Sequence, residues 1–442
     1  MYYEMSMLLV SIVFMIWSTA VKKINAFFVL LFVSIFFGTV CGIDQIQIIT
    51  VLKSGFGKTM EKIGILIIFG TALGIILERT GATVSMANTI IRLVKEKHAP
   101  IAIALTGFVV GLPIFCDSAF IILSGLNNSL INRSGKGKLM MVSILAFSLL
   151  VVHCFIPPHP GITAAASTLG LDLGLLMVWG ICISVPVILA GYAWASWNKL
   201  SKGEDATPEQ LFTEQIIQMP SAYRSFIPVI LPIVLIAAKS ILFLPVVGVV
   251  KNSGIWRFFN IVGDPVYALG IGIIASFFLI KKDTIAHLND WVSDALLKAG
   301  LILSVTAGGG IFGEMIQVTG VGKALGDWMG NNASGIFLPF ILSAILKSAQ
   351  GSSTVAVITT ASIVAPIMAT MGIHTNTEIL LYVLSMGAGS MVFSHANDSY
   401  FWVICKFSNI EPNSALKMYS TGTALMGIFA QIIIWGVFQV VR

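Results

Sequence analysis

Apolar runs long enough to cross a membrane recur along this 442-residue chain. A transmembrane helix needs about 20 apolar residues in succession. The runs at 225–247 and 417–441 reach that length with a single charged residue each. They are apolar on every side, whereas the strands of a membrane β-barrel alternate apolar and polar residues. The chain is therefore predicted to be an all-α polytopic membrane protein.

The composition excludes a soluble protein. Charged residues make up 10% of the chain and apolar residues 57%, whereas a soluble domain carries about 25% charged residues. We expect ten transmembrane helices, which lie at about 5–21, 25–43, 63–78, 139–156, 171–197, 225–247, 261–280, 299–316, 378–404 and 417–441.

Two further apolar regions, 99–131 and 335–372, are each too long for one span and too short for two spans with a loop. Polar or Gly/Pro-containing sequence interrupts both, at 111–118 (Gly-Leu-Pro-Ile-Phe-Cys-Asp-Ser) and at 350–354 (Gln-Gly-Ser-Ser-Thr). Irregular backbone at membrane depth is tolerated only where it lines a cavity. We therefore expect two re-entrant hairpins whose tips lie near the middle of the membrane.

The distribution of charge sets the orientation. With the N-terminus outside, most of the 26 Lys and Arg residues fall in inner loops, as the positive-inside bias requires. This bias accounts for the net charge of +6 without a nucleic-acid partner. Lys53, Lys58 and Lys62 fall on the outer side, against the bias.

The two halves of the chain are similar in sequence. The pattern G-x3-G-x5-T-G begins at Gly70 and again at Gly309, 239 positions later, and the interruptions follow at Gly111 and Gly351. In the topology above the two copies run in opposite directions, which is typical of secondary transporters. We expect an inverted repeat of five helices and one hairpin: a first repeat at 1–197 with its hairpin at about 99–131, a cytoplasmic linker at 198–224, and a second repeat at 225–442 with its hairpin at about 335–372.

Polar residues within apolar segments are costly in a membrane and are candidates for function. Asp117 and Ser118 end the first interruption, where they either cap the half-helix that follows or orient substrate. Asp117 is also a proton-coupling candidate. His153 precedes the helix-breaking run Pro-Pro-His-Pro-Gly, and His159 lies within it. Histidine titrates near neutral pH, so both are proton-coupling candidates. The alternatives are a packed core residue for His153 and a loop residue for His159.

The second interruption contains the residues Gln350, Gly351, Ser352, Ser353 and Thr354. Free N–H groups at a half-helix N-terminus attract a carboxylate, and hydroxyl groups both donate to and accept from a polyol. We expect these residues to bind substrate, against the alternative of a purely structural cap. Lys347, just before them, either pairs with an anion or extends toward the membrane surface.

A further polar patch at 394–400 lies inside the apolar region 378–404, so it either breaks the helix or lines a cavity. Asn397 is a candidate for binding substrate hydroxyls, and His395 and Asp398 are proton-coupling candidates. On a continuous helix these two titratable side chains would share a face and a proton. A structural polar network is the alternative. Glu314, beside Gly313 in the repeated helix, is a weaker candidate for a functional residue.

The sequence indicates no cofactor and no metal. The five cysteines stand singly, without the paired spacing of metal or disulfide sites. The run Gly308-Gly309-Gly310 lacks the Lys and Ser/Thr of a nucleotide-binding loop. Primary pumping by ATP is therefore not expected.

At these patches the sequence resembles the gluconate permease family of bacterial carboxylate:proton symporters, a branch of the ion transporter superfamily. The resemblance rests on motifs that recur in order over essentially the whole chain: GLPIFCD at 111–117, PPHPG at 157–161, AQGSSTVA at 349–356 and SHANDSYFW at 394–402. It implies proton-driven uptake of gluconate or a related small hydroxy acid across a bacterial inner membrane. It also implies a homodimer with a scaffold and an elevator-like transport domain.

The resemblance leaves the substrate open, because related members carry D-serine, ketogluconates or other sugar acids. Cys116 replaces the Phe of familiar members, and Ser118-Ala119 replaces Val-Gly, which implies altered specificity. An uncoupled facilitator or channel is one rival interpretation, disfavoured by the buried titratable groups. A membrane-embedded enzyme with a metal at His153, His159 and His395 is another, disfavoured because their spacing is not that of ligands.

Overall fold

The computed structural model describes residues 2–198, 219–243, 251, 253–321, 333–368 and 371–441. All regular structure within these ranges is helical. The α-helices are α1 (Tyr2–Ala20), α2 (Ala26–Val40), α3 (Gln45–Arg79), α4 (Ala82–Val94), α5 (Ala99–Gly111), α6 (Cys116–Ser134), α7 (Lys138–Phe155), α8 (Pro160–Leu169), α9 (Leu173–Trp197), α10 (Ala222–Leu242), α11 (Gly254–Val262), α12 (Pro265–Phe277), α13 (Leu288–Thr319), α15 (Phe337–Gln350), α16 (Ser353–Val364), α17 (Asn376–Gly389), α18 (Ser399–Ser408), α19 (Pro412–Ala415) and α20 (Thr421–Val441). Short segments are η1 (Glu96–His98), η4 (Lys282–His287), η5 (Ala333–Ile336), η6 (Ala365–Ile367) and the π-helical η7 (Leu416–Ser420).

The protein is a multi-pass membrane protein, as its apolar helices indicate. Six helical segments of the described chain are long and apolar enough to span a membrane, and the bent pair α11–α12 raises this number to seven. The ten expected spans are not all recovered, because several expected regions form shorter helices, such as the 15-residue α2. The six segments are Gln45–Arg79, Lys138–Leu169, Leu173–Trp197, Ala222–Leu242, Thr284–Thr319 and Pro412–Val441.

The expected span 378–404 is interrupted, which is one of the two alternatives that its polar patch leaves open. Helix α17 ends at Gly389 and α18 begins only at Ser399. The intervening segment is polar, and Asp398 caps α18 by accepting a hydrogen bond from the Tyr400 N–H. A side-chain cap of this kind competes with continued helix and stabilises a new start. The expected linker at 198–224 lies mostly outside the described residues.

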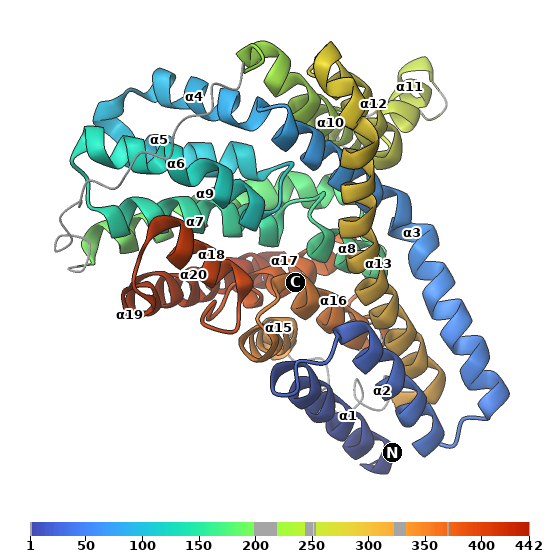
Figure 1. Ribbon diagram of the computed structural model, residues 1–442. Coiled ribbons are helices and arrows are strands. Elements are labelled where there is room, and N and C mark those ends of the chain that lie inside the picture. The colour runs from blue at the N-terminus through green and yellow to red at the C-terminus, as the bar shows by residue number, and fades with distance from the viewer. Residues whose placement is uncertain are drawn as a thin grey trace.

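The two longest helices, α3 and α13, lie side by side along one edge of the molecule (Figure 1). Glycines allow their backbones to approach closely. A Cβ on Gly55 of α3 would lie 2.7 Å from the Cα of Ile311 on α13, and a Cβ on Gly310 would lie 2.0 Å from the Thr59 Oγ1. Small residues at such a contact are typical of helix packing in membranes. Helix α2 packs on α13, and α12 packs on α3.

Helix α7 lies in the core, and α5, α6, α9 and α17 pack against it. It is apolar on all sides, and nearly all of its residues are buried under α5, α6 and α9. Helix α10 is nearly as apolar, but most of its surface is left uncovered by the rest of the chain. Apolarity alone does not distinguish these two environments.

Four helix breaks meet in the interior. Helix α5 ends at Gly111 and α6 begins at Cys116, while α15 ends at Gln350 and α16 begins at Ser353. The other two breaks, 156–159 and 390–398, separate α7 from α8 and α17 from α18. Helix α16 packs on α8, and α18 packs on α6, so segments from both halves of the chain meet at the breaks.

Candidate functional site

A cavity of about 400 Å³ lies where these breaks meet. This volume is within the ~300–1,000 Å³ range of small-molecule sites. The polar residues of its wall come from the break segments and the helix starts beside them. Its apolar residues include Leu301, Ile302 and Val305 of α13. The lining residues are Phe115, Cys116, Asp117, Leu150, His153, Pro160, Leu301, Ile302, Val305, Lys347, Gln350, Gly351, Ser352, Ser353, Thr354, Val355, Asn397, Asp398, Ser399 and Tyr400.

Four helices begin at this cavity: α6, α8, α16 and α18. The first N–H groups of a helix have no intrahelical partner and form the positive end of its dipole, so helix N-termini attract anions. Helix α6 already carries Asp117 in its first turn, and α18 has Asp398 at its N-cap. Helix α16 has no acid in its first turn, and its first residues carry hydroxyl groups. Helix α8 also has no acid in its first turn, but it begins with Pro160, which has no N–H to donate. The N-terminus of α16 is therefore the one best suited to a carboxylate.

Several buried polar atoms of the wall have no hydrogen-bond partner among the described residues. They are Asp117 Oδ1, His153 Nδ1, Gln350 Oε1 and Nε2, and Asn397 Oδ1. A buried polar group without a partner costs about 1–3 kcal/mol. Donors and acceptors in this number, around one cavity, match a ligand that carries several hydroxyl groups as well as a carboxylate.

Lys347 of α15 forms a buried ion pair with Asp398. The Lys347 Nζ lies 2.6 Å from Asp398 Oδ2, and the two side chains are 1% and 6% exposed. The same ammonium group donates to the Gly351 carbonyl O at 2.7 Å. Asp398 also accepts a hydrogen bond from the Ser394 hydroxyl. Of the two alternatives for Lys347, the structure shows pairing with an anion.

Gly351 brings α15–α16 against the break between α17 and α18. Its φ of +83° is the left-handed conformation that favours glycine. A Cβ at this position would lie 2.0 Å from the Asn397 carbonyl O. The glycine is therefore needed both for the turn and for the close approach of the two backbones. Gly161 on α8 is needed for close approach alone, since a Cβ there would lie 2.9 Å from the Thr354 Cα.

The three candidate histidines occupy different positions. His153 lines the cavity, and its Nε2 lies 3.3 Å from the Thr354 Oγ1. His159 is 4% exposed and its Nε2 donates to the Gly111 carbonyl O at 2.8 Å, beside a smaller cavity. His395 donates to the Ser348 carbonyl O at 3.1 Å. His395 does not share a face with Asp398, because the helix is broken between Ser390 and Ser399.

The cavity thus brings together most of the polar residues expected at the site: Asp117, His153, Gln350, Gly351, Ser352, Ser353, Thr354, Asn397 and Asp398. Ser118, His159 and His395 are not among its lining residues. Sequence reasoning missed the apolar wall formed by Phe115, Leu150 and α13. These residues resemble every other apolar residue of a membrane helix, so no local signal identifies them.

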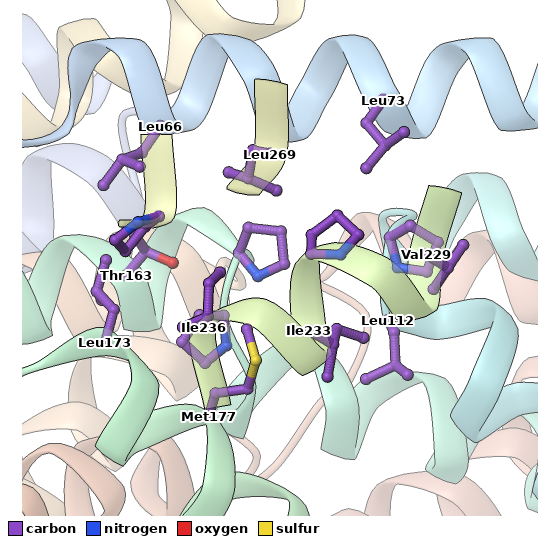
Figure 2. Close-up of a pocket in the computed structure, with 15 residues that line it drawn as sticks. Leu66, Leu73, Leu112, Thr163, Leu173, Met177, Val229, Ile233, Ile236 and Leu269 are labelled. Atoms are coloured by element: carbon purple, nitrogen blue, oxygen red, sulfur yellow. The ribbon is translucent and has the colours of Figure 1, made fainter. Parts of the chain in front are cut away.

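Two other cavities differ in character from this one. Figure 2 shows an apolar pocket of about 30 Å³, where Leu66 and Leu73 of α3 face side chains of α10 such as Ile233. It is unsuited to a charged ligand. A polar cavity of about 320 Å³ between α3 and α13 holds Glu314, which pairs with Lys58 at 2.6 Å. Lys58 is 58% exposed and Glu314 is 20% exposed, so this pair is partly solvated.

Comparisons with known proteins identify relatives that are permeases and transporters. A family model described as "GntP family permease" matches residues 3–441. The chain is 32% identical over 416 residues to the Gnt-II system L-idonate transporter of Escherichia coli (strain K12), covering 92% of each chain. It is 32% identical over 410 residues to the high-affinity gluconate transporter of the same organism, covering 90% of this chain and 91% of that one.

The fold is that of known transporters. The structure is similar to that of Neisseria gonorrhoeae MtrF, described as one of a class of antimetabolite efflux pumps, with a TM-score of 0.66 and 15% identity over 89% of this chain and 84% of that chain. It is also similar to the Alcanivorax borkumensis YdaH transporter, with a TM-score of 0.60 and 13% identity over 88% and 87% of the two chains. At these identities the likeness concerns the fold alone.

Proposed function

The chain belongs to the GntP permease family, and from this we propose that it imports gluconate or a related small hydroxy acid by proton symport across a bacterial inner membrane. The observation that carries the proposal is the 400 Å³ cavity, at which four helix N-termini meet and several buried polar atoms lack protein partners. The names of the idonate and gluconate transporters among its relatives support the substrate class.

The substrate lies between the first break and the second. Its carboxylate meets the N–H groups at the start of α16, with the Ser353 and Thr354 hydroxyls close by. Gln350 and Asn397 bond the substrate hydroxyls, since both amides have atoms without protein partners. Asp117 of α6 also lines the cavity and orients another part of the substrate.

The halves form an inverted repeat, and the helix pairs α5–α6 and α15–α16 are re-entrant hairpins. The order of elements supports this. Each half has a long helix (α3 or α13), then a pair with a short break, then a broken helix (α7–α8 or α17–α18), then a last helix (α9 or α20). The paired breaks lie about 240 positions apart, at Gly111 and Gly351.

Transport follows an elevator-like movement of the hairpins along α3 and α13. The contacts along this path support the proposal, because glycines without side chains lie at them. A Cβ on Gly74 of α3 would lie 2.6 Å from the Pro113 carbonyl O at the α5–α6 break, and one on Gly313 of α13 would lie 3.0 Å from the Ser362 carbonyl O of α16. Glycine faces allow one packed body to slide past another without side chains that interlock.

Uptake by purified protein in proteoliposomes tests the proposal. D-gluconate, L-idonate, ketogluconates, glycerate and D-serine are supplied outside, with an acid-outside pH gradient. We expect at least one hydroxy acid to accumulate against its gradient, an uncoupler to abolish accumulation, and sodium to have no effect at fixed pH. Accumulation that depends on sodium would contradict proton symport. Counterflow without accumulation would favour an uncoupled facilitator, and accumulation of D-serine alone would change the substrate class.

A further inference from the structure

We propose that Lys347 is the cation that binds the substrate carboxylate, and that protonation of Asp398 frees it to do so. One proton then enters the cavity with each carboxylate. This inference rests on the proposed function and adds the residue pair that couples the two ions.

The geometry places Lys347 between its present partner and the proposed carboxylate position. Its ammonium group donates to Asp398 Oδ2 at 2.6 Å and to the Gly351 carbonyl O at 2.7 Å. Gly351 and Ser352 form the turn that leads into α16, so the ammonium lies beside the N-terminus of this helix. Lys347 itself lines the cavity. An ammonium group has three donors, so one donor is left beyond these two bonds.

The burial of this pair calls for a functional explanation. Both side chains are nearly excluded from solvent, at 1% and 6% exposure. Removing two charges from water costs more than their attraction commonly returns, so a buried ion pair is weak evidence for a stabilising role. A pair at the wall of a cavity is also a place where one partner can be exchanged for another anion.

Charge balance gives the coupling its direction. With Asp398 ionised, Lys347 is neutralised, and a substrate carboxylate would bring an uncompensated negative charge into a buried cavity. With Asp398 protonated, the ammonium is the uncompensated charge, and the substrate carboxylate neutralises it. Asp398 keeps its hydrogen bonds from the Tyr400 N–H and with Ser394 in either state. The proton and the carboxylate therefore favour each other's binding.

Asp398 is better placed for this role than Asp117, which has no bonded cation among the described residues. Asp117 interacts electrostatically with Asp398, with Lys347 and, more weakly, with Lys298 of α13, but it forms no ion pair with either lysine. When ionised, Asp117 adds a second negative charge to the same cavity wall and so strengthens the need for a proton when an anion enters. The other titratable groups around the pair are Cys116 of α6, His153 and Cys154 of α7, His159 and His395 of the breaks, Tyr400 of α18 and Tyr419 of η7.

Titration calorimetry with D-gluconate tests the proposal on the full-length protein. Binding is measured across a pH series and in buffers of different ionisation enthalpy, which gives the number of protons taken up with each ligand. For wild type we expect one proton per gluconate and an affinity that falls up to tenfold per pH unit once Asp398 is ionised, the slope for one linked proton. For Asp398→Asn we expect no proton uptake and an affinity independent of pH.

Asp117→Asn is the matched control, because it neutralises the other carboxylate of the same cavity. Whatever its absolute affinity for D-gluconate, the Asp117→Asn variant should still take up one proton per ligand, and its affinity should still fall as the pH rises. A slope that survives in Asp398→Asn, or that disappears in Asp117→Asn, would overturn the inference and leave the proposed function standing. Failure of the wild-type protein to bind any hydroxy acid would overturn the proposed function, and this inference with it.

A second variant isolates Lys347. Adding Lys347→Gln to Asp398→Asn removes both charges of the pair, so no unpaired buried charge remains to unfold the protein. A charge-assisted hydrogen bond is worth about 10- to 100-fold in affinity. We expect the double variant to bind D-gluconate weaker than Asp398→Asn by this factor, and to bind the neutral analogue D-gluconamide with little change. Equal losses for both ligands would overturn the assignment of Lys347 to the carboxylate.

Discussion

Replacing Gly351 by alanine is expected to disable uptake by displacing the backbone around Asp398. The added Cβ would lie 2.0 Å from the Asn397 carbonyl O, 2.5 Å from its carbonyl C and 3.0 Å from the Asp398 N. All three are backbone atoms, so no change of rotamer relieves the clash. Because real Cβ contacts do not fall below 3.0 Å, the loop must retreat by about 1 Å.

The consequences of this shift follow from the distances at the site. Moving Asp398 away by about 1 Å lengthens the 2.6 Å contact with Lys347 to about 3.6 Å, beyond hydrogen-bond range. A misplacement of about 1 Å in a binding constellation costs roughly 100-fold in rate. The left-handed backbone adds a separate cost of about 1–2 kcal/mol for any residue with a Cβ. We therefore expect uptake to fall by about 100-fold.

Gly170→Ala is the matched control for the backbone cost. Gly170 has a φ of +74°, and no atom lies within 4 Å of the position that a Cβ would occupy, so its replacement adds strain without a clash. Uptake is measured in proteoliposomes, normalised to incorporated protein, and thermal unfolding in detergent monitors stability. Both variants should lose some stability, but Gly170→Ala should keep uptake within about twofold of wild type. Equal uptake by the two variants would refute the reasoning.

Two further predictions concern the surfaces around α3 and α13. Gly74→Ala places a Cβ 2.6 Å from the Pro113 carbonyl O. It should lower the rate of uptake by more than it lowers the D-gluconate affinity measured by calorimetry. Equal losses in the two would argue against a sliding contact. Glu314→Gln removes the charge that pairs with Lys58 but keeps an acceptor for the Ser54 hydroxyl, and the two charged side chains are 20% and 58% exposed. It should change the free energy of unfolding by about 1 kcal/mol, and a much larger drop in stability would contradict this.

The helix breaks could be predicted from the sequence because their causes are local. Pro113 removes a backbone donor and clashes with the preceding turn, so α5 cannot continue through it. Gly351 permits the left-handed turn that ends α15, and Ser352 then caps α16 by accepting from the Val355 N–H. Each of these effects acts within about four residues, and each is encoded by the residue type.

The partners of the site residues could not be predicted in this way. The spacing of His395 and Asp398 predicts that they share a proton on one helix face, yet Asp398 pairs with Lys347, 51 positions away. His395 instead bonds the Ser348 carbonyl O. Long-range partners depend on how helices pack, and a polar side chain in an apolar region gives no sign of which other one it will meet.

By itself, the sequence determined that the protein is helical, that it lies in a membrane, where its helices break and which residues are polar enough to matter there. These properties follow from hydropathy and from the local conformational preferences of Pro, Gly and Ser. Only the tertiary structure decided that Asp117, His153 and Asp398 line one cavity while Ser118, His159 and His395 are not part of its wall. It also decided that α13 closes the cavity with apolar side chains. The physical reason is that burial and ion pairing depend on packing between segments distant in the chain, and similar apolar helices can pack in many ways before such contacts select one.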